Sequence, residues 1–133
     1  MVTPQRTDLI ALTNSQATYS LASFNSGDTA PFEGIEAAYA NADILFHKAY
    51  SFDPKANELD AKAPVSLPYM QAFHTSTEEL AGILKTVKPR LTVLYHYTVF
   101  THPDQTDQER GVKEIEGFGY DGLVIQSQDG DIF

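Results

Sequence analysis

The sequence contains no cysteine, and this absence removes several kinds of chemistry. Without thiols the chain cannot form disulfides, build a thiolate zinc site or use a cysteine nucleophile. The redox state of its compartment is left undetermined for the same reason. Histidine and carboxylate side chains are therefore the candidate metal ligands of this protein.

Long apolar runs are also absent. The start of the chain, from Met1 to Arg6, lacks the basic segment and following apolar stretch of a secretory signal. No apolar run approaches the roughly 20 residues needed to span a bilayer. We therefore expect a cytoplasmic protein without a membrane partner, although a processed or truncated precursor would have the same appearance.

Basic residues are scarce, with 9 lysines and arginines against 18 acidic residues, a net charge of −9 and a pI near 4.6. Proteins that bind nucleic acid carry a broad basic footprint, so we do not expect this chain alone to bind nucleic acid. A polyanionic substrate would have to be held locally, by a metal ion or a few donors. The 133 residues, 42% of them hydrophobic, are enough for a single domain over residues 1–133 with a core of its own.

Hydrophobic periodicity and turn residues divide the chain into strands and helices. We expect a β-hairpin over residues 8–24, helices over residues 31–41, 76–88 and 107–117, and strands over residues 43–47, 91–95 and 123–125. Ser76-Thr77-Glu78-Glu79 has the S-x-x-E form of a capping box. Residues 51–68 contain three prolines and little periodicity, which is typical of a long loop that could act as a lid. Strands separated by helices predict an α/β fold.

Three polar segments stand where a strand should give way to a loop or a helix. They are Ser26-Gly27-Asp28-Thr29, Phe73-His74-Thr75-Ser76 and Leu94-Tyr95-His96-Tyr97. Ligands and metals in open α/β sheets collect beyond the carboxyl ends of the strands. We therefore expect the carboxylate of Asp28 and the imidazoles of His74 and His96 to lie close together, as a candidate site.

Each of these residues also has a structural interpretation. Asp28 would be an N-terminal cap for a helix that begins near Pro31. His96 would be a hydrogen-bonded core residue at the end of a buried strand. His74 would belong to the capping turn before Ser76. The functional alternative for His74 is to donate a proton to a leaving oxygen.

The order of four segments resembles the C-terminal half of metallo-β-lactamase-fold hydrolases, most closely the ribonuclease Z-like branch. The segments are Phe24-Asn25-Ser26-Gly27-Asp28-Thr29-Ala30-Pro31, Asn41-Ala42-Asp43-Ile44-Leu45-Phe46-His47, Phe73-His74-Thr75-Ser76-Thr77-Glu78-Glu79-Leu80-Ala81 and Leu91-Thr92-Val93-Leu94-Tyr95-His96. Four ordered segments are far more specific than a single motif, and they cover most of the chain from Phe24 onward.

The resemblance implies half of an αββα sandwich, with a mixed β-sheet and helices packed on one face. It also implies a two-metal hydrolase of phosphodiesters, esters or sulfate esters, with zinc as the expected cofactor and manganese or iron as alternatives. In that family the aspartate matching Asp28 bridges the metals and the histidine matching His96 ligates one of them. The histidine matching His74 assists the leaving group or binds the substrate phosphate.

Two departures from the family pattern limit this transfer. The H-x-H-x-D-H run that supplies most of the metal ligands is absent, and no histidine precedes Gly27. Asp28 and His96 alone cannot hold a metal pair, because even one catalytic zinc normally takes three protein ligands. In addition, Lys48 stands where the ribonuclease Z-like pattern usually has a glutamate, and a cation near His74 would disfavour its protonated form.

The leading hypothesis is therefore the C-terminal part of a metal-dependent hydrolase, inactive alone, whose partner is an N-terminal half that supplies the missing ligands. Its substrate would be a small molecule or a phosphodiester. The alternative is a non-catalytic module that kept the half-fold for self-association or partner binding. A third hypothesis is a small enzyme that binds one metal through Asp28, His47 and His96. His102, in a proline-flanked loop, is expected to be a surface residue.

Overall fold

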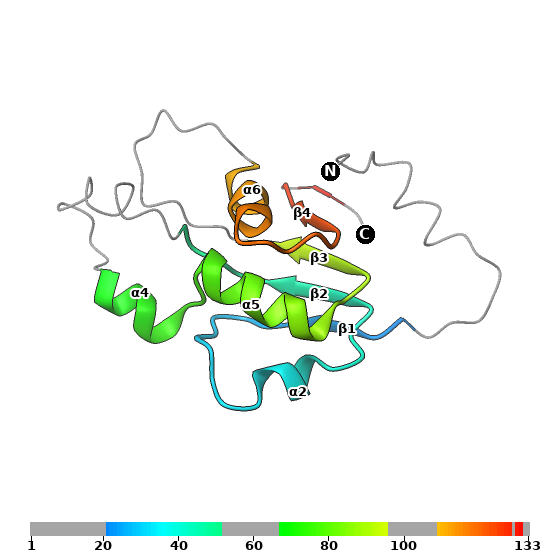
Figure 1. Cartoon of the computed structure of the whole chain (residues 1–133), viewed down its shortest axis with the longest axis horizontal. Helices are drawn as coiled ribbons and strands as arrows, with labels where there is room; N and C mark the ends of the chain where they lie inside the picture. The colour runs from blue at the N-terminus through cyan, green and yellow to red at the C-terminus, as the bar shows by residue number, and fades with distance from the viewer. Residues whose placement is uncertain (1–20, 52–66, 96–108, 129, 132–133) are drawn as a thin grey trace.

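The computed structural model describes residues 21–51, 67–95, 109–128 and 130–131 (Figure 1). Strands and helices alternate along these ranges, as expected of an α/β fold. The elements are β1 (Ser23–Asn25), α2 (Ile35–Tyr39), β2 (Ile44–His47), α4 (Leu67–Phe73), α5 (Thr77–Val87), β3 (Leu91–Leu94), α6 (Arg110–Gly117) and β4 (Val124–Gln126). The expectation of a single domain over residues 1–133 stays a prediction.

The four described strands form one sheet in the order β1-β2-β3-β4, and every neighbouring pair is parallel. Parallel neighbours need a crossover between them, and helices of this chain provide it. The family resemblance implied a mixed sheet, and the hairpin expected over residues 8–24 would provide an antiparallel pair. Most of that hairpin lies outside the described residues. Its last two residues, Ser23 and Phe24, belong to β1, which pairs with β2 in parallel.

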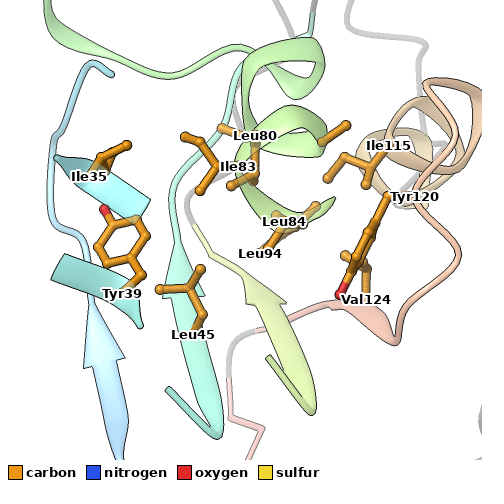
Figure 2. Packing of buried hydrophobic residues seen from close by; sticks show 12 residues of the cluster. Ile35, Tyr39, Leu45, Leu80, Ile83, Leu84, Leu94, Ile115, Tyr120 and Val124 are labelled. Carbon is orange, nitrogen blue, oxygen red and sulfur yellow. The ribbon is translucent and has the colours of Figure 1, made fainter. Parts of the chain in front are cut away.

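Helices α2, α5 and α6 pack on one face of this sheet. Leu45 of β2 is in register with Thr92 of β3, which is in register with Val124 of β4, so these side chains share a face. Figure 2 shows helix side chains pointing toward the strand side chains of this face. The buried cluster comprises Ile35, Tyr39, Leu45, Ala49, Leu80, Ala81, Ile83, Leu84, Leu94, Ile115, Tyr120 and Val124.

Helix α2 is shorter than the sequence indicates. Pro31 and the spacing of the apolar residues after it predicted a helix over residues 31–41, but the helix runs from Ile35 to Tyr39. Its N-cap residue, Gly34, has φ 92°, in the left-handed region, and such a residue interrupts a right-handed helix. The buried residues of the helix are Ile35 and Tyr39.

Helix α5 agrees with the sequence interpretation in detail. The backbone N–H of Glu79 donates to Oγ of Ser76 at 3.2 Å, and the backbone N–H of Ser76 donates to Oε2 of Glu79 at 2.8 Å. This is the capping box that the S-x-x-E pattern predicted. Leu80, Ile83 and Leu84 of the helix are buried against the sheet.

Helix α4 was not anticipated, because the prolines around it were interpreted as loop signals. Pro68 lies in the first turn of the helix, where proline is tolerated because its missing N–H has no intrahelical partner. Met70 is buried in this helix, whereas Tyr69 and Phe73 are half exposed. Residues 52–66 of the expected loop lie outside the described residues.

The last two elements differ from expectation only at their ends. Helix α6 begins at Arg110, and residues 107 and 108 of the expected helix lie outside the described ranges. Strand β4 is displaced by one residue from the expected residues 123–125. None of the helices that the structure describes is both long and apolar enough to cross a membrane.

We predict that Leu84→Ala destabilises the protein by about 2–5 kcal/mol, because Leu84 is fully buried where α5 meets the sheet and alanine leaves a cavity there. Urea unfolding followed by circular dichroism measures the change. Thr86→Ala, on the exposed side of the same helix, is the control and should change stability by no more than about 0.5 kcal/mol. Equal effects of the two substitutions would contradict this packing.

Candidate functional site

The loops that follow β1 and β2 lie at the same edge of the sheet as Tyr95, the residue after β3. The hydroxyl of Tyr95 donates to Oδ1 of Asn25 at 2.7 Å, and its backbone N–H donates to the carbonyl of His47 at 3.2 Å. The backbone N–H of Lys48 donates to Oγ of Ser26 at 3.4 Å. Polar groups from three strand ends are thus tied together where parallel sheets bind their ligands.

Asp28 lies in the loop between β1 and α2, and its carboxylate is one member of an ion pair. Gly27 precedes it with φ 61° and donates its N–H to Oδ1 of Asn25 at 3.0 Å, which shapes the turn. The Asp28 side chain is 67% exposed. It does not cap α2, whose N-cap is Gly34, so the capping interpretation of Asp28 is wrong.

The partner of Asp28 is Lys48, the residue directly after β2. Nζ of Lys48 donates to Oδ1 of Asp28 at 2.8 Å. Only 8% of the Lys48 side chain is exposed, so most of this side chain is shielded from water. A buried charge of this kind is stable only when it is paired, and Asp28 provides the pairing.

His74 enters the same cluster from the connection between α4 and α5. Its Nδ1 lies 4.0 Å from Oδ1 of Asp28, and its side chain is 8% exposed. Its backbone N–H donates to the carbonyl of Met70 at 2.8 Å, and its ring lies edge-on to Tyr69 with centroids 6.0 Å apart. The structure therefore brings Asp28 and His74 together, while His96 lies outside the described residues.

A hydrogen bond between two loops holds the cluster in place. The hydroxyl of Thr75 donates to the carbonyl of Thr29 at 2.6 Å, which joins the segment before α5 to the loop after β1. Tyr50 and Ser76 form a parallel bridge, which joins the same segment to the chain after β2. Asp28, Lys48 and His74 are consequently positioned by three connected segments.

The described residues do not provide a metal site. Within residues 21–51, 67–95 and 109–128, no three histidine, aspartate or glutamate side chains gather as metal ligands would. The ammonium group of Lys48 lies against Oδ1 of Asp28, so a positive charge already stands beside this carboxylate. The assignment of Asp28 and His96 as metal ligands stays a prediction.

His47 ends β2 but belongs to the core. It is fully buried, and its Nδ1 lies 2.6 Å from the carbonyl of Lys48. A carbonyl only accepts, so Nδ1 carries the proton and Nε2 accepts from the Tyr39 hydroxyl at 3.2 Å. Burial lowers the pKa of His47, which favours this neutral form. Both ring nitrogens are thus used inside the protein, which argues against His47 as a metal ligand.

A second polar network was missed by sequence reasoning. Its centre is Glu114 of α6, whose Oε1 accepts from the Ser51 hydroxyl at 2.6 Å and whose Oε2 accepts from the Thr77 hydroxyl at 2.7 Å. Nε of Arg110 also donates to Oε1, at 3.0 Å. The network connects α6 to the start of α5 and to the chain after β2. No local pattern connects residues so far apart in sequence.

No protein-family model and no curated protein matches the chain. Among solved structures, the chain is similar to the crystal structure of the metallo-β-lactamase fold protein YhfI from Bacillus subtilis, with a TM-score of 0.58 and 17% sequence identity. The match covers 84% of this chain and 39% of that chain. The likeness shows the fold: the parallel sheet and its helices correspond to part of a metallo-β-lactamase-like fold.

The burial of His47 leads to a pH prediction. The pKa of His47 is lower in the folded protein than in the unfolded chain. As the pH decreases below about 6.5, the unfolded chain therefore binds a proton at His47 more readily than the native protein does, and the free energy of unfolding decreases. His47→Gln should reduce this slope when the free energy of unfolding is measured from pH 8 to pH 5. His102→Gln, at the expected surface histidine, is the control. An unchanged slope in His47→Gln would contradict the assignment.

Proposed function

We propose that this chain is the C-terminal part of a hydrolase of the metallo-β-lactamase superfamily, from its ribonuclease Z-like branch, which cleaves phosphodiesters, esters or sulfate esters. Its site is completed by an N-terminal half carrying the H-x-H-x-D-H residues that this sequence lacks. Zinc is the expected cofactor of the complete protein, with manganese or iron as alternatives.

The observation that carries the proposal is the short distance between the side chains of Asp28 and His74. They come from connections that are distant in sequence, yet Oδ1 of Asp28 lies 4.0 Å from Nδ1 of His74. Both lie within the ordered segments that resemble the hydrolase family, and the fold agrees with that resemblance. An imidazole beside a carboxylate at a sheet edge is suited to proton transfer to a leaving oxygen.

In this proposal the two side chains have separate tasks. Oδ1 of Asp28 lies close enough to Nδ1 of His74 to favour one orientation of the His74 ring. His74, which is nearly buried, then holds the proton that the leaving oxygen receives. The match covering 39% of the structural neighbour is consistent with the remaining groups belonging to another part of the protein.

Reconstitution tests the hydrolase proposal. We expect the chain, fused to an N-terminal half with the H-x-H-x-D-H run taken from the structural neighbour, to hydrolyse at least one of bis(p-nitrophenyl) phosphate, p-nitrophenyl acetate and p-nitrophenyl sulfate in the presence of zinc, manganese or iron. His74→Ala should lower kcat by about 10²-fold or more, because a general acid is lost.

Two controls accompany this experiment. The N-terminal half alone should have negligible activity, and Lys113→Ala, on the exposed side of α6, should leave the activity of the fusion unchanged. A folded fusion that cleaves none of the three esters would overturn the proposal, as would a His74→Ala variant with full activity.

A second candidate function, self-association, is favoured by the composition of the other sheet face. The register places Phe46, Val93 and Ile125 together on the face opposite the helices. Val93 is buried, whereas Phe46 and Ile125 are only partly buried. A partly exposed apolar face of this kind promotes association with a second copy or with another half-fold.

Sedimentation velocity tests this second candidate. The unsubstituted chain should sediment as a dimer or larger species at high concentration, and Phe46→Lys should shift it toward the monomer, because a charge at the interface must be desolvated. Phe32→Lys is a matched control, since Phe32 is 52% exposed in the loop before α2. A folded chain that remains monomeric at every concentration would eliminate self-association.

A further inference from the structure

Lys48 is the most unusual side chain of the candidate site. It is a lysine whose side chain is only 8% exposed, while its carboxylate partner is 67% exposed. Lysine is almost never buried to this extent without a partner. The ion pair with Asp28, at 2.8 Å, is the contact that compensates the buried charge of Lys48.

This ion pair and a metal ion at Asp28 compete for the same oxygen. An ammonium group at hydrogen-bond distance from Oδ1 places a positive charge beside the carboxylate that a divalent cation would use as a ligand. A metal ion bound to the Asp28 carboxylate would lie near the Lys48 ammonium group, and the two positive charges would repel one another strongly in a partly desolvated site. The ammonium group also contributes no lone pair, so Lys48 is not a ligand that could join Asp28 and His74.

We infer that Lys48 fills the cation position at Asp28 and is the residue that sets the metal affinity of this chain. The ammonium group neutralises the Asp28 carboxylate and ties the loop after β1 to the end of β2. Divalent metal ions are therefore bound weakly. A carboxylate at position 48 would lie beside Asp28 and His74, and the three side chains would form a metal site.

Metal titration of the isolated chain tests this inference. Zn²⁺ binding is measured by calorimetry, and Co²⁺ binding is measured by the visible absorption of the bound ion. Lys48→Glu should bind both ions at least about tenfold more tightly than the unsubstituted chain, because a repelling charge is replaced by a ligand. Lys48→Gln, which only removes the charge, should give a smaller gain.

The controls separate a specific site from a change in net charge. Lys113→Glu changes the charge of the chain by the same amount on the exposed side of α6, and should leave metal affinity unchanged. Adding Asp28→Asn or His74→Ala to Lys48→Glu should abolish the gain. The inference is overturned if the unsubstituted chain binds zinc as tightly as Lys48→Glu, or if Lys113→Glu gains as much.

A second measurement examines the ion pair without substituting Lys48. An amine-reactive reagent should label Lys48 much more slowly than exposed Lys113, as followed by mass spectrometry, because the Lys48 ammonium is paired and nearly buried. Asp28→Asn should raise the labelling rate of Lys48 severalfold and leave that of Lys113 unchanged. Equal labelling of Lys48 in both proteins would overturn the inference.

This inference concerns the same edge as the proposed hydrolase but can fail separately. Metal affinity and lysine labelling are measured on the chain alone, whereas hydrolysis is measured on the reconstituted protein. Loss of the labelling difference would remove the role of Lys48 and leave the hydrolase proposal standing. An inactive fusion would remove the hydrolase and leave the ion pair unaffected.

Discussion

Parallel pairing of the four strands is the constraint on which the other features of this protein depend. Neighbouring parallel strands cannot be joined by a tight turn, so the chain must cross over between them, and here helices make the crossings. Because α2, α5 and α6 pack on the same face, their apolar stripes and that face of the sheet form one core. The same pairing brings the carboxyl ends of all four strands to one edge, where the loops can meet.

Polar side chains at that edge are stabilised by contacts between segments distant in sequence. Asp28 is paired with Lys48, and His74 approaches the same carboxylate oxygen. The hydroxyl of Thr75 holds the segment of His74 against the loop of Asp28. In the core beneath, His47 makes a separate set of hydrogen bonds, with Tyr39 and with the carbonyl of Lys48.

The fold alone does not determine the chemistry of the edge. The likeness to a metallo-β-lactamase fold protein shows the fold, and the chemistry depends on side chains such as Asp28 and His74, which lie 4.0 Å apart at this edge. The position of the Lys48 ammonium argues that this chain by itself has little affinity for metal. The hydrolase proposal and the inference about Lys48 agree if the chain supplies part of a site whose remaining groups lie in another half of the fold.

Local patterns in the sequence determined the α/β class, the capping box of α5 and the approximate positions of β2, β3, β4 and α6, because apolar periodicity and caps act over a few residues. They misplaced the start of α2, because the left-handed conformation of Gly34 prevents the helix from beginning before Ile35. They also missed α4, because Pro68 is as compatible with a first helical turn as with a loop. Sequence also indicated that Asp28 and His74 would meet. Only the tertiary structure decided that Lys48 pairs with Asp28 and that Glu114 joins Ser51 to Thr77, because these contacts depend on how strands and helices pack, which no local pattern encodes.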